Sequence, residues 1–257
     1  MLCLHGLTRN SADFAWIAAH LALRRRVICV DQRGRGRSDY DPVIENYTPA
    51  TYVEDMFKLL DEQELNHVVV IGTSMGGLMA MLMANLQPGR LAAVVINDIG
   101  PELDPAGLDR VKSYVGTGHE IRSWEDAVAH TRAINAVAFP TYSDEQWLRF
   151  TRALYREVDS IPHLAYDPAI AQPMLDDDSN AVPPDLWPLF QNMAGIPMLV
   201  VRGELSDILA RDCVARMREL VPGLEVAEIP ERGHAPMLDE PAAVAAIDAF
   251  LARVDGV

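Results

Sequence analysis

Short apolar runs bounded by turn residues recur along the chain. Runs of this length that are rich in β-branched residues are typical of strands buried on both faces of a parallel sheet. Six such runs can be delimited: Leu2–Leu4, Val27–Val30, Val68–Ile71, Ala93–Ile96, Met198–Val201 and Leu224–Ile229.

Segments with the helical spacing of apolar residues lie between or after these runs. They are Ala12–Leu23, Ala50–Asp61, Gly77–Leu86, Asp212–Leu220 and Pro241–Leu251. Thr48 and Pro49 favour a helix start, because the hydroxyl can cap free amides and proline is tolerated at the first helical position. The alternation of strand and helix predicts an α/β fold in which helices cover both faces of a mostly parallel sheet.

The alternation stops between Gly100 and Met193. Helical segments follow one another there without a strand candidate, and prolines interrupt them repeatedly. A chain of 257 residues can bury one large core. We therefore predict one α/β core, formed by residues 1–99 and 194–257, and a helical cap insertion, residues 100–193, over the carboxyl ends of the strands.

Charge and composition exclude several classes of partner. The formal net charge is −15 and the isoelectric point is near 4.8, so we expect no nucleic-acid partner. No segment approaches the roughly 18 consecutive apolar residues of a membrane span, and the N-terminus has no basic segment followed by an apolar one. The sequence thus predicts a cytoplasmic protein without a membrane partner.

The three cysteines, Cys3, Cys29 and Cys213, are expected to be structural thiols, because the first two lie inside apolar runs. Neither a CxxC pair nor an HExxH pattern occurs. We therefore expect no metal site and no cofactor.

A candidate nucleophile follows the run Val68–Ile71. The sequence Gly72-Thr73-Ser74-Met75-Gly76 has the G-x-S-x-G pattern, and a helical segment begins directly after it. A strained strand-to-helix turn of this kind exposes the serine hydroxyl, and small residues on either side let strand and helix approach. Taken alone, Ser74 could instead be a helix cap.

The first strand also ends in a turn of interest, His5-Gly6-Leu7. Such a loop can supply the second backbone amide of an oxyanion hole, so we expect the N–H groups of Leu7 and Met75 to hold the charge of a tetrahedral intermediate. His5 sits where the strand becomes the loop, and we expect it to fix this loop rather than act as the base.

An acid and a base follow the last two strand candidates. Asp207 comes just after Met198–Val201, and His234 comes after Leu224–Ile229. A serine needs an imidazole to take its proton and a carboxylate to orient that imidazole, and the chain order Ser, Asp, His satisfies this requirement. Asp98, just beyond Ala93–Ile96, is an alternative acid, but Asp207 is favoured because its strand precedes the histidine loop.

These residues together resemble the α/β-hydrolase fold family with a helical cap. The turn Asp31–Ser38 matches the D-x-R-G-x-G-x-S pattern of the family, and Arg232–Pro236 resembles its histidine loop. The similarity spans the chain from Leu2 to Ala252 and extends to esterases, enol-lactonases and carbon–carbon bond hydrolases. Arg33 and Arg35 in the Asp31–Ser38 turn could bind an anion, but we expect their charges to face solvent or to brace a neighbouring loop.

The resemblance also indicates what precedes Leu2 in relatives, namely two strands that pair antiparallel. Their absence here predicts a sheet of about six parallel strands with Val27–Val30 at its edge. We expect this edge to be either unpaired or covered by a partner molecule, as in a homo-oligomer, because an exposed apolar edge invites pairing with a second chain. An upstream segment that this sequence lacks is favoured over natural loss as the reason for the absent strands.

A hydrolase of small-molecule carboxylic esters or lactones that uses an acyl-enzyme on Ser74 is the predicted function. A serine at this position excludes the dehalogenases and epoxide hydrolases of the fold, which need an aspartate. A carbon–carbon hydrolase or acyltransferase on the same scaffold, and a ligand receptor with little turnover, stay open. Five aromatic residues of the cap are candidates for the substrate pocket: Trp124, Phe139, Tyr142, Trp147 and Trp187.

Overall fold

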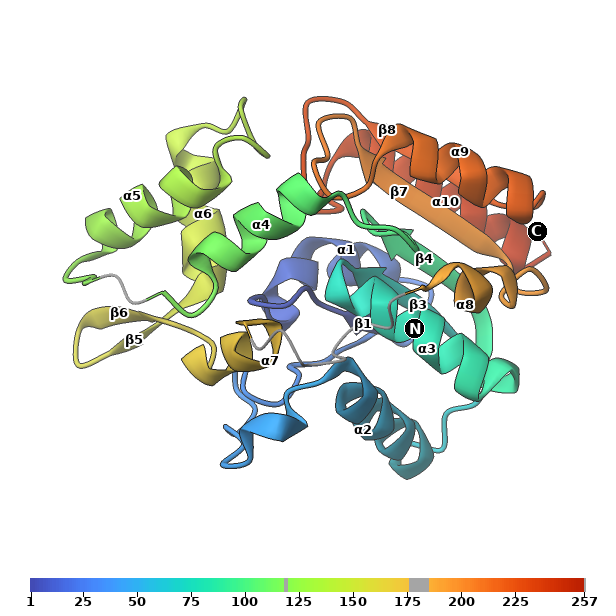
Figure 1. Cartoon of the computed structure of the whole chain (residues 1–257), viewed down its shortest axis with the longest axis horizontal. Helices are drawn as coiled ribbons and strands as arrows, with labels where there is room; N and C mark the ends of the chain where they lie inside the picture. Colours follow the sequence, from blue (N-terminus) through green and yellow to red (C-terminus); the bar gives the residue numbers. More distant parts are fainter. Residues whose placement is uncertain (118–119, 176–184, 257) are drawn as a thin grey trace.

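The computed structural model describes residues 1–117, 120–175 and 185–256 (Figure 1). In this part of the chain a six-stranded sheet has the order β2-β1-β3-β4-β7-β8, and every neighbouring pair is parallel. The strands are β1 (Leu2–Leu4), β2 (Ile28–Cys29), β3 (Val68–Thr73), β4 (Leu91–Asn97), β7 (Met198–Gly203) and β8 (Glu225–Ile229). The six predicted strands are confirmed, and so is the predicted place of the second strand at the sheet edge.

Helices cover both faces of this sheet, as predicted. Side chains of β3 alternate: Val68 and Val70 belong to one apolar cluster, and Val69 and Ile71 belong to another. The first cluster packs against α2 (Pro49–Glu62), α3 (Met75–Leu86) and α9 (Arg211–Leu220). The second packs against α1 (Ala15–Leu21) and α10 (Pro241–Val254). The Thr48 hydroxyl caps α2 by accepting from the Thr51 N–H, with Pro49 at the first helical position.

Residues 100–193 are mostly helical where the structure describes them, and Figure 1 shows α4 between the sheet and the more distant α5 and α6. Their helices are α4 (Pro105–Tyr114), α5 (Trp124–Asn135), α6 (Asp144–Leu154), α7 (Gln172–Leu175) and α8 (Trp187–Gln191). No described helix is long and apolar enough to span a bilayer. The division into core and cap stays a prediction.

The expectation that this segment has no strand was wrong. β5 (Tyr155–Val158) and β6 (Ile161–Leu164) form an antiparallel hairpin. Asp159 and Ser160 between them both have positive φ, which matches the right-handed twist of a two-residue hairpin turn. The apolar period is hidden in the sequence, because several of these side chains are exposed and Pro162 interrupts the second strand.

Two glycines let β1, β3 and α3 approach one another. A Cβ on Gly72 would lie 2.3 Å from the Gly76 carbonyl oxygen, and a Cβ on Gly76 would lie 2.0 Å from that of Leu4. Both neighbours are backbone atoms and cannot turn away. The turn between β3 and α3 therefore requires glycine, which has no Cβ, at positions 72 and 76.

We expect Gly76→Ala to lower the free energy of unfolding by about 3 kcal/mol, because the added methyl group pushes α3 away from β1. Gly89→Ala is the matched control, since a Cβ there meets nothing within 4 Å, and we expect it to change the free energy by less than about 0.5 kcal/mol. Urea denaturation of both variants measures the difference. Equal stabilities would contradict the close packing.

Candidate active site

Ser74 lies in a strained turn between β3 and α3. Its φ and ψ are 51° and −116°, backbone angles that residues other than glycine rarely adopt. The Ser74 N–H donates to the carbonyl of Asn97 over 2.9 Å, which ties this turn to the end of β4. The hydroxyl is thereby held at the carboxyl end of the sheet.

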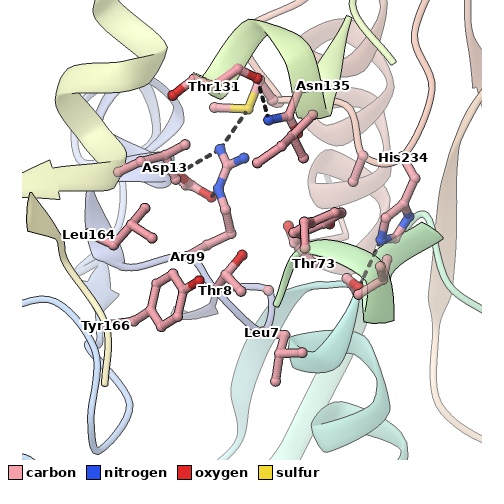
Figure 2. A pocket seen from close by; sticks show the side chains of 18 of the residues that line it. Leu7, Thr8, Arg9, Asp13, Thr73, Thr131, Asn135, Leu164, Tyr166 and His234 are labelled. Carbon is pink, nitrogen blue, oxygen red and sulfur yellow. Dashed lines mark hydrogen bonds and ion pairs between the residues drawn. The ribbon is translucent and has the colours of Figure 1, made fainter. Parts of the chain in front are cut away.

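His234 reaches this hydroxyl from the loop after β8. Its Nε2 lies 2.9 Å from Ser74 Oγ, and Figure 2 shows His234 at one side of the cavity. The histidine loop is braced from two sides, because the Gly233 N–H donates to the Ala138 carbonyl and the Asn97 side chain donates to the Pro236 carbonyl.

Asp98, directly after β4, holds the other nitrogen of the imidazole. His234 Nδ1 lies 2.9 Å from Asp98 Oδ2, and the aspartate side chain is fully buried. Two further groups donate to this carboxylate: the Gly203 N–H at 2.8 Å and the Ser206 hydroxyl at 2.7 Å. The Ser206 hydroxyl also accepts the Leu209 N–H, so its own proton is directed at Asp98. Sequence analysis missed the contribution of Ser206.

The prediction that Asp207 orients His234 was wrong in this geometry. Asp207 forms two hydrogen bonds with Arg110 of α4, and its oxygens are committed to that guanidinium. Burial opposes ionisation of Asp207, but Arg110 outweighs it and lowers the pKa of this carboxyl. α4 comes close enough because of Gly107: a Cβ there would lie 1.9 Å from the Asp207 carbonyl oxygen.

The loop after β1 lies beside Ser74. A Cβ on Gly6 would be 3.6 Å from Ser74 Cβ, and Leu7 is the next residue of this loop. Met75 is the first residue of α3, and its N–H has no acceptor within the helix. Leu7 and Met75 directly follow Gly6 and Ser74 in the chain, and their role as the two amides of an oxyanion hole stays a prediction.

Buried polar groups hold this loop in place. His5 Nδ1 donates to the Gly6 carbonyl over 2.7 Å, and His5 Nε2 accepts the Gln32 N–H over 3.0 Å. Arg35 is fully buried and donates to the Leu7 carbonyl and to the Tyr52 hydroxyl. These contacts agree with the expected scaffold role of His5 and with a bracing role for Arg35.

The pocket residues expected from the cap were wrong. The cavity beside Ser74 and His234 has none of the five predicted aromatic residues among the described side chains that line it. Phe139, Tyr142 and Trp147 instead pack against one another and Phe150. Trp124 stacks on Arg152, and Trp187 on Arg216. Helical spacing indicates that these side chains are buried, but it does not show which residues they pack against.

Residues from several elements line the cavity instead. Apolar and aromatic contributions come from Phe14, Val111, Tyr114, Leu154, Tyr155, Leu164 and Tyr166. Polar contributions include Arg9, Asp13, Thr131 and Asn135, which Figure 2 places across the cavity from His234. Among the residues that the structure describes, no group of three or more His, Cys, Asp or Glu side chains could hold a metal ion.

Comparisons with known proteins match most of the chain. The sequence model described as "Alpha/beta hydrolase family" matches residues 1–247. The chain is 35% identical to a 3-hydroxybutyrate-oligomer hydrolase of Cupriavidus necator, over 97% of this chain and 87% of the relative. It is 29% identical to a 2-(acetamidomethylene)succinate hydrolase of Mesorhizobium japonicum, over 91% and 81%. The crystal structure of an alpha/beta hydrolase from Novosphingobium aromaticivorans superposes with a TM-score of 0.93 at 42% identity, over 98% of this chain and 88% of that one.

We expect the His5 ring to stay neutral, with the proton on Nδ1, throughout the range in which most histidines titrate. Burial lowers its pKa to about 4. The unfolded chain takes up this proton near pH 6.5, so the free energy of unfolding falls by about 3 kcal/mol as the pH drops from 6.5 towards 4. Nitrogen-15 NMR of the ring measures the titration. A midpoint near 6.5 would contradict the buried scaffold role.

Proposed function

Because the chain belongs to the alpha/beta hydrolase family, we propose that it hydrolyses a small-molecule carboxylic ester or lactone through an acyl-enzyme on Ser74. One observation carries this proposal: a continuous chain of hydrogen bonds runs from the Ser74 hydroxyl through His234 to the buried carboxylate of Asp98. This arrangement supplies what a serine needs to act as a nucleophile near neutral pH.

The first half of the reaction forms the acyl-enzyme. His234 Nε2 takes the Ser74 proton as Oγ attacks the ester carbonyl, and Asp98 stabilises the imidazolium through Nδ1. The negative charge on the former carbonyl oxygen is held by the N–H groups of Leu7 and Met75. Collapse of this intermediate breaks the ester bond, and His234 gives its proton to the departing alcohol.

The second half releases the acid. His234 takes a proton from water, whose oxygen attacks the acyl carbonyl, and the same two amides hold the second oxyanion. Collapse returns the proton to Ser74 Oγ and frees the carboxylic acid. A lactone follows the same steps, with the alcohol and the acid in one product.

Relatives support ester chemistry. The Cupriavidus necator protein bears the name of a hydrolase of 3-hydroxybutyrate oligomers, and ester bonds join the units of such oligomers. A carbon–carbon hydrolase or acyltransferase would turn over a diketo acid or transfer the acyl group to an acceptor other than water. A receptor would bind ligand with little turnover. Assays with p-nitrophenyl esters, a ring-cleavage diketo acid and acyl acceptors separate these alternatives.

A fluorophosphonate should modify Ser74, because an activated hydroxyl beside two amide donors attacks such a reagent quickly. We expect peptide mass spectrometry to locate the adduct on this residue, and Ser74→Ala to lower kcat for a p-nitrophenyl ester by about 10⁴-fold or more. An adduct elsewhere, or full turnover by the variant, would reject the proposal.

The two aspartates near the histidine should differ sharply. Asp98→Asn should lower kcat by about 10³- to 10⁴-fold, because the amide leaves His234 without a charged partner and favours the wrong tautomer. Asp207→Asn, the matched control, should lower it by about tenfold or less, since Asp207 contacts Arg110. Steady-state kinetics with circular dichroism as a folding check decide between them, and a larger effect at Asp207 would refute the assignment.

A further inference from the structure

Arg9 is a charged residue in the cavity that the proposed chemistry does not use. It lies two residues after Leu7, and a Cβ on Gly6 would contact Arg9 Cγ at 3.4 Å and Ser74 Cβ at 3.6 Å. The side chains of Arg9 and Ser74 therefore flank the same glycine. Figure 2 shows the guanidinium extending from this loop towards Thr131 and Asn135, with His234 on the opposite side of the cavity.

One edge of this guanidinium is already paired. Arg9 Nε and Nη2 donate to the two oxygens of Asp13 over 2.7 and 2.8 Å. The flat face lies 4.2 Å from the centre of the Phe150 ring. These contacts fix the orientation of the group, so little side-chain entropy remains to be lost when a ligand binds.

The other edge, formed by Nη1 and Nη2, lacks a strong acceptor. Its contact is the Met237 thioether sulfur, 3.2 Å from Nη2, and no described residue accepts a hydrogen bond from Nη1. Sulfur in a thioether is a weak acceptor, whereas a guanidinium edge matches the two oxygens of a carboxylate. Arg9 thus has one edge of hydrogen-bond donors, Nη1 and Nη2, that can bind a ligand near Ser74.

Its charge also stands out against the rest of the molecule. The chain carries a formal net charge of −15, which repels anions at a distance. Arg9 and Asp13 are the only Lys, Arg, Asp or Glu among the described residues that line the cavity. Both side chains are largely buried, with exposed fractions of 16% and 9%, so water screens them little.

From this geometry we propose that Arg9 binds a free carboxylate of the substrate through its Nη1–Nη2 edge. The enzyme would then select esters of short hydroxy acids in which one acid group is esterified and another, a few bonds away, is free. The inference rests on the proposed function, since the ester must reach Ser74 while its carboxylate meets Arg9. A ligand carboxylate would replace the weak thioether contact and leave the Arg9–Asp13 pair intact.

Two substrates that differ in one charge test this proposal: the linear dimer of 3-hydroxybutyrate and its methyl ester. We expect the enzyme to prefer the free acid. Arg9→Gln should lower the ratio of kcat/KM for the acid to kcat/KM for the methyl ester by about 30-fold, the strength of a charged hydrogen bond. Arg122→Gln, at an exposed arginine paired with Glu120, is the control and should keep the ratio.

Equal losses for both substrates in Arg9→Gln would overturn the proposal, because they would make Arg9 a structural residue only. A wild-type enzyme that turns over the methyl ester as well as the acid would overturn it too. If Arg9→Gln does not fold, the same ratio of kcat/KM values measured for Asp13→Asn still tests the proposal. This substitution removes the competing negative charge, so the ratio should hold or rise, and a fall would count against the proposal.

Failure of the proposed function is detected separately. If neither dimer nor methyl ester is hydrolysed, binding of 3-hydroxybutyrate to Ser74→Ala protein, measured by calorimetry, still tests Arg9. We expect the double variant Ser74→Ala, Arg9→Gln to bind this anion about 30-fold more weakly. Equal affinities would overturn the role of Arg9, whatever reaction Ser74 performs.

Discussion

The buried carboxylate of Asp98 is the constraint around which this end of the molecule is organised. A charge without access to water must be matched by donors, and three reach it: the Gly203 N–H, the Ser206 hydroxyl and His234 Nδ1. Asp98 follows β4. Gly203 ends β7, Ser206 follows it, and His234 follows β8; β7 and β8 lie next to β4 in the sheet in that order. The sheet order thus brings acid and base together.

Much of this arrangement could be predicted from the sequence, and the reason is local. Buried parallel strands are continuous apolar runs in the sequence, so all six strands could be predicted close to their observed limits. The pattern from Gly72 to Gly76 is likewise local, since each glycine is needed where strand, serine turn and helix touch. His234 was found because it follows the last strand of the sheet.

What could not be predicted depends on contacts between distant segments. Asp98 and Asp207 follow adjacent strands, so chain order alone allows either to face the histidine. Arg110 lies more than ninety residues before Asp207 in the chain, and its hydrogen bonds to Asp207 leave Asp98 to face the histidine. The prediction that aromatic residues such as Phe139 and Trp147 line the pocket was wrong for a similar reason. Their spacing is that of buried side chains, but they are buried against each other. The β5–β6 hairpin lies mostly exposed and leaves no apolar period.

The Arg110–Asp207 pair has a consequence for the choice of partner at the imidazole. Asp98 and Asp207 follow neighbouring strands of the sheet, so two carboxylates lie at the end of the sheet where His234 is held. Arg110 of α4 occupies both oxygens of Asp207, which leaves Asp98 as the carboxylate that the ring contacts. A helix that contributes no atom to the hydrogen-bond chain from Ser74 to Asp98 thereby keeps the imidazole in one orientation, by compensating the charge of the carboxylate that would otherwise compete for it.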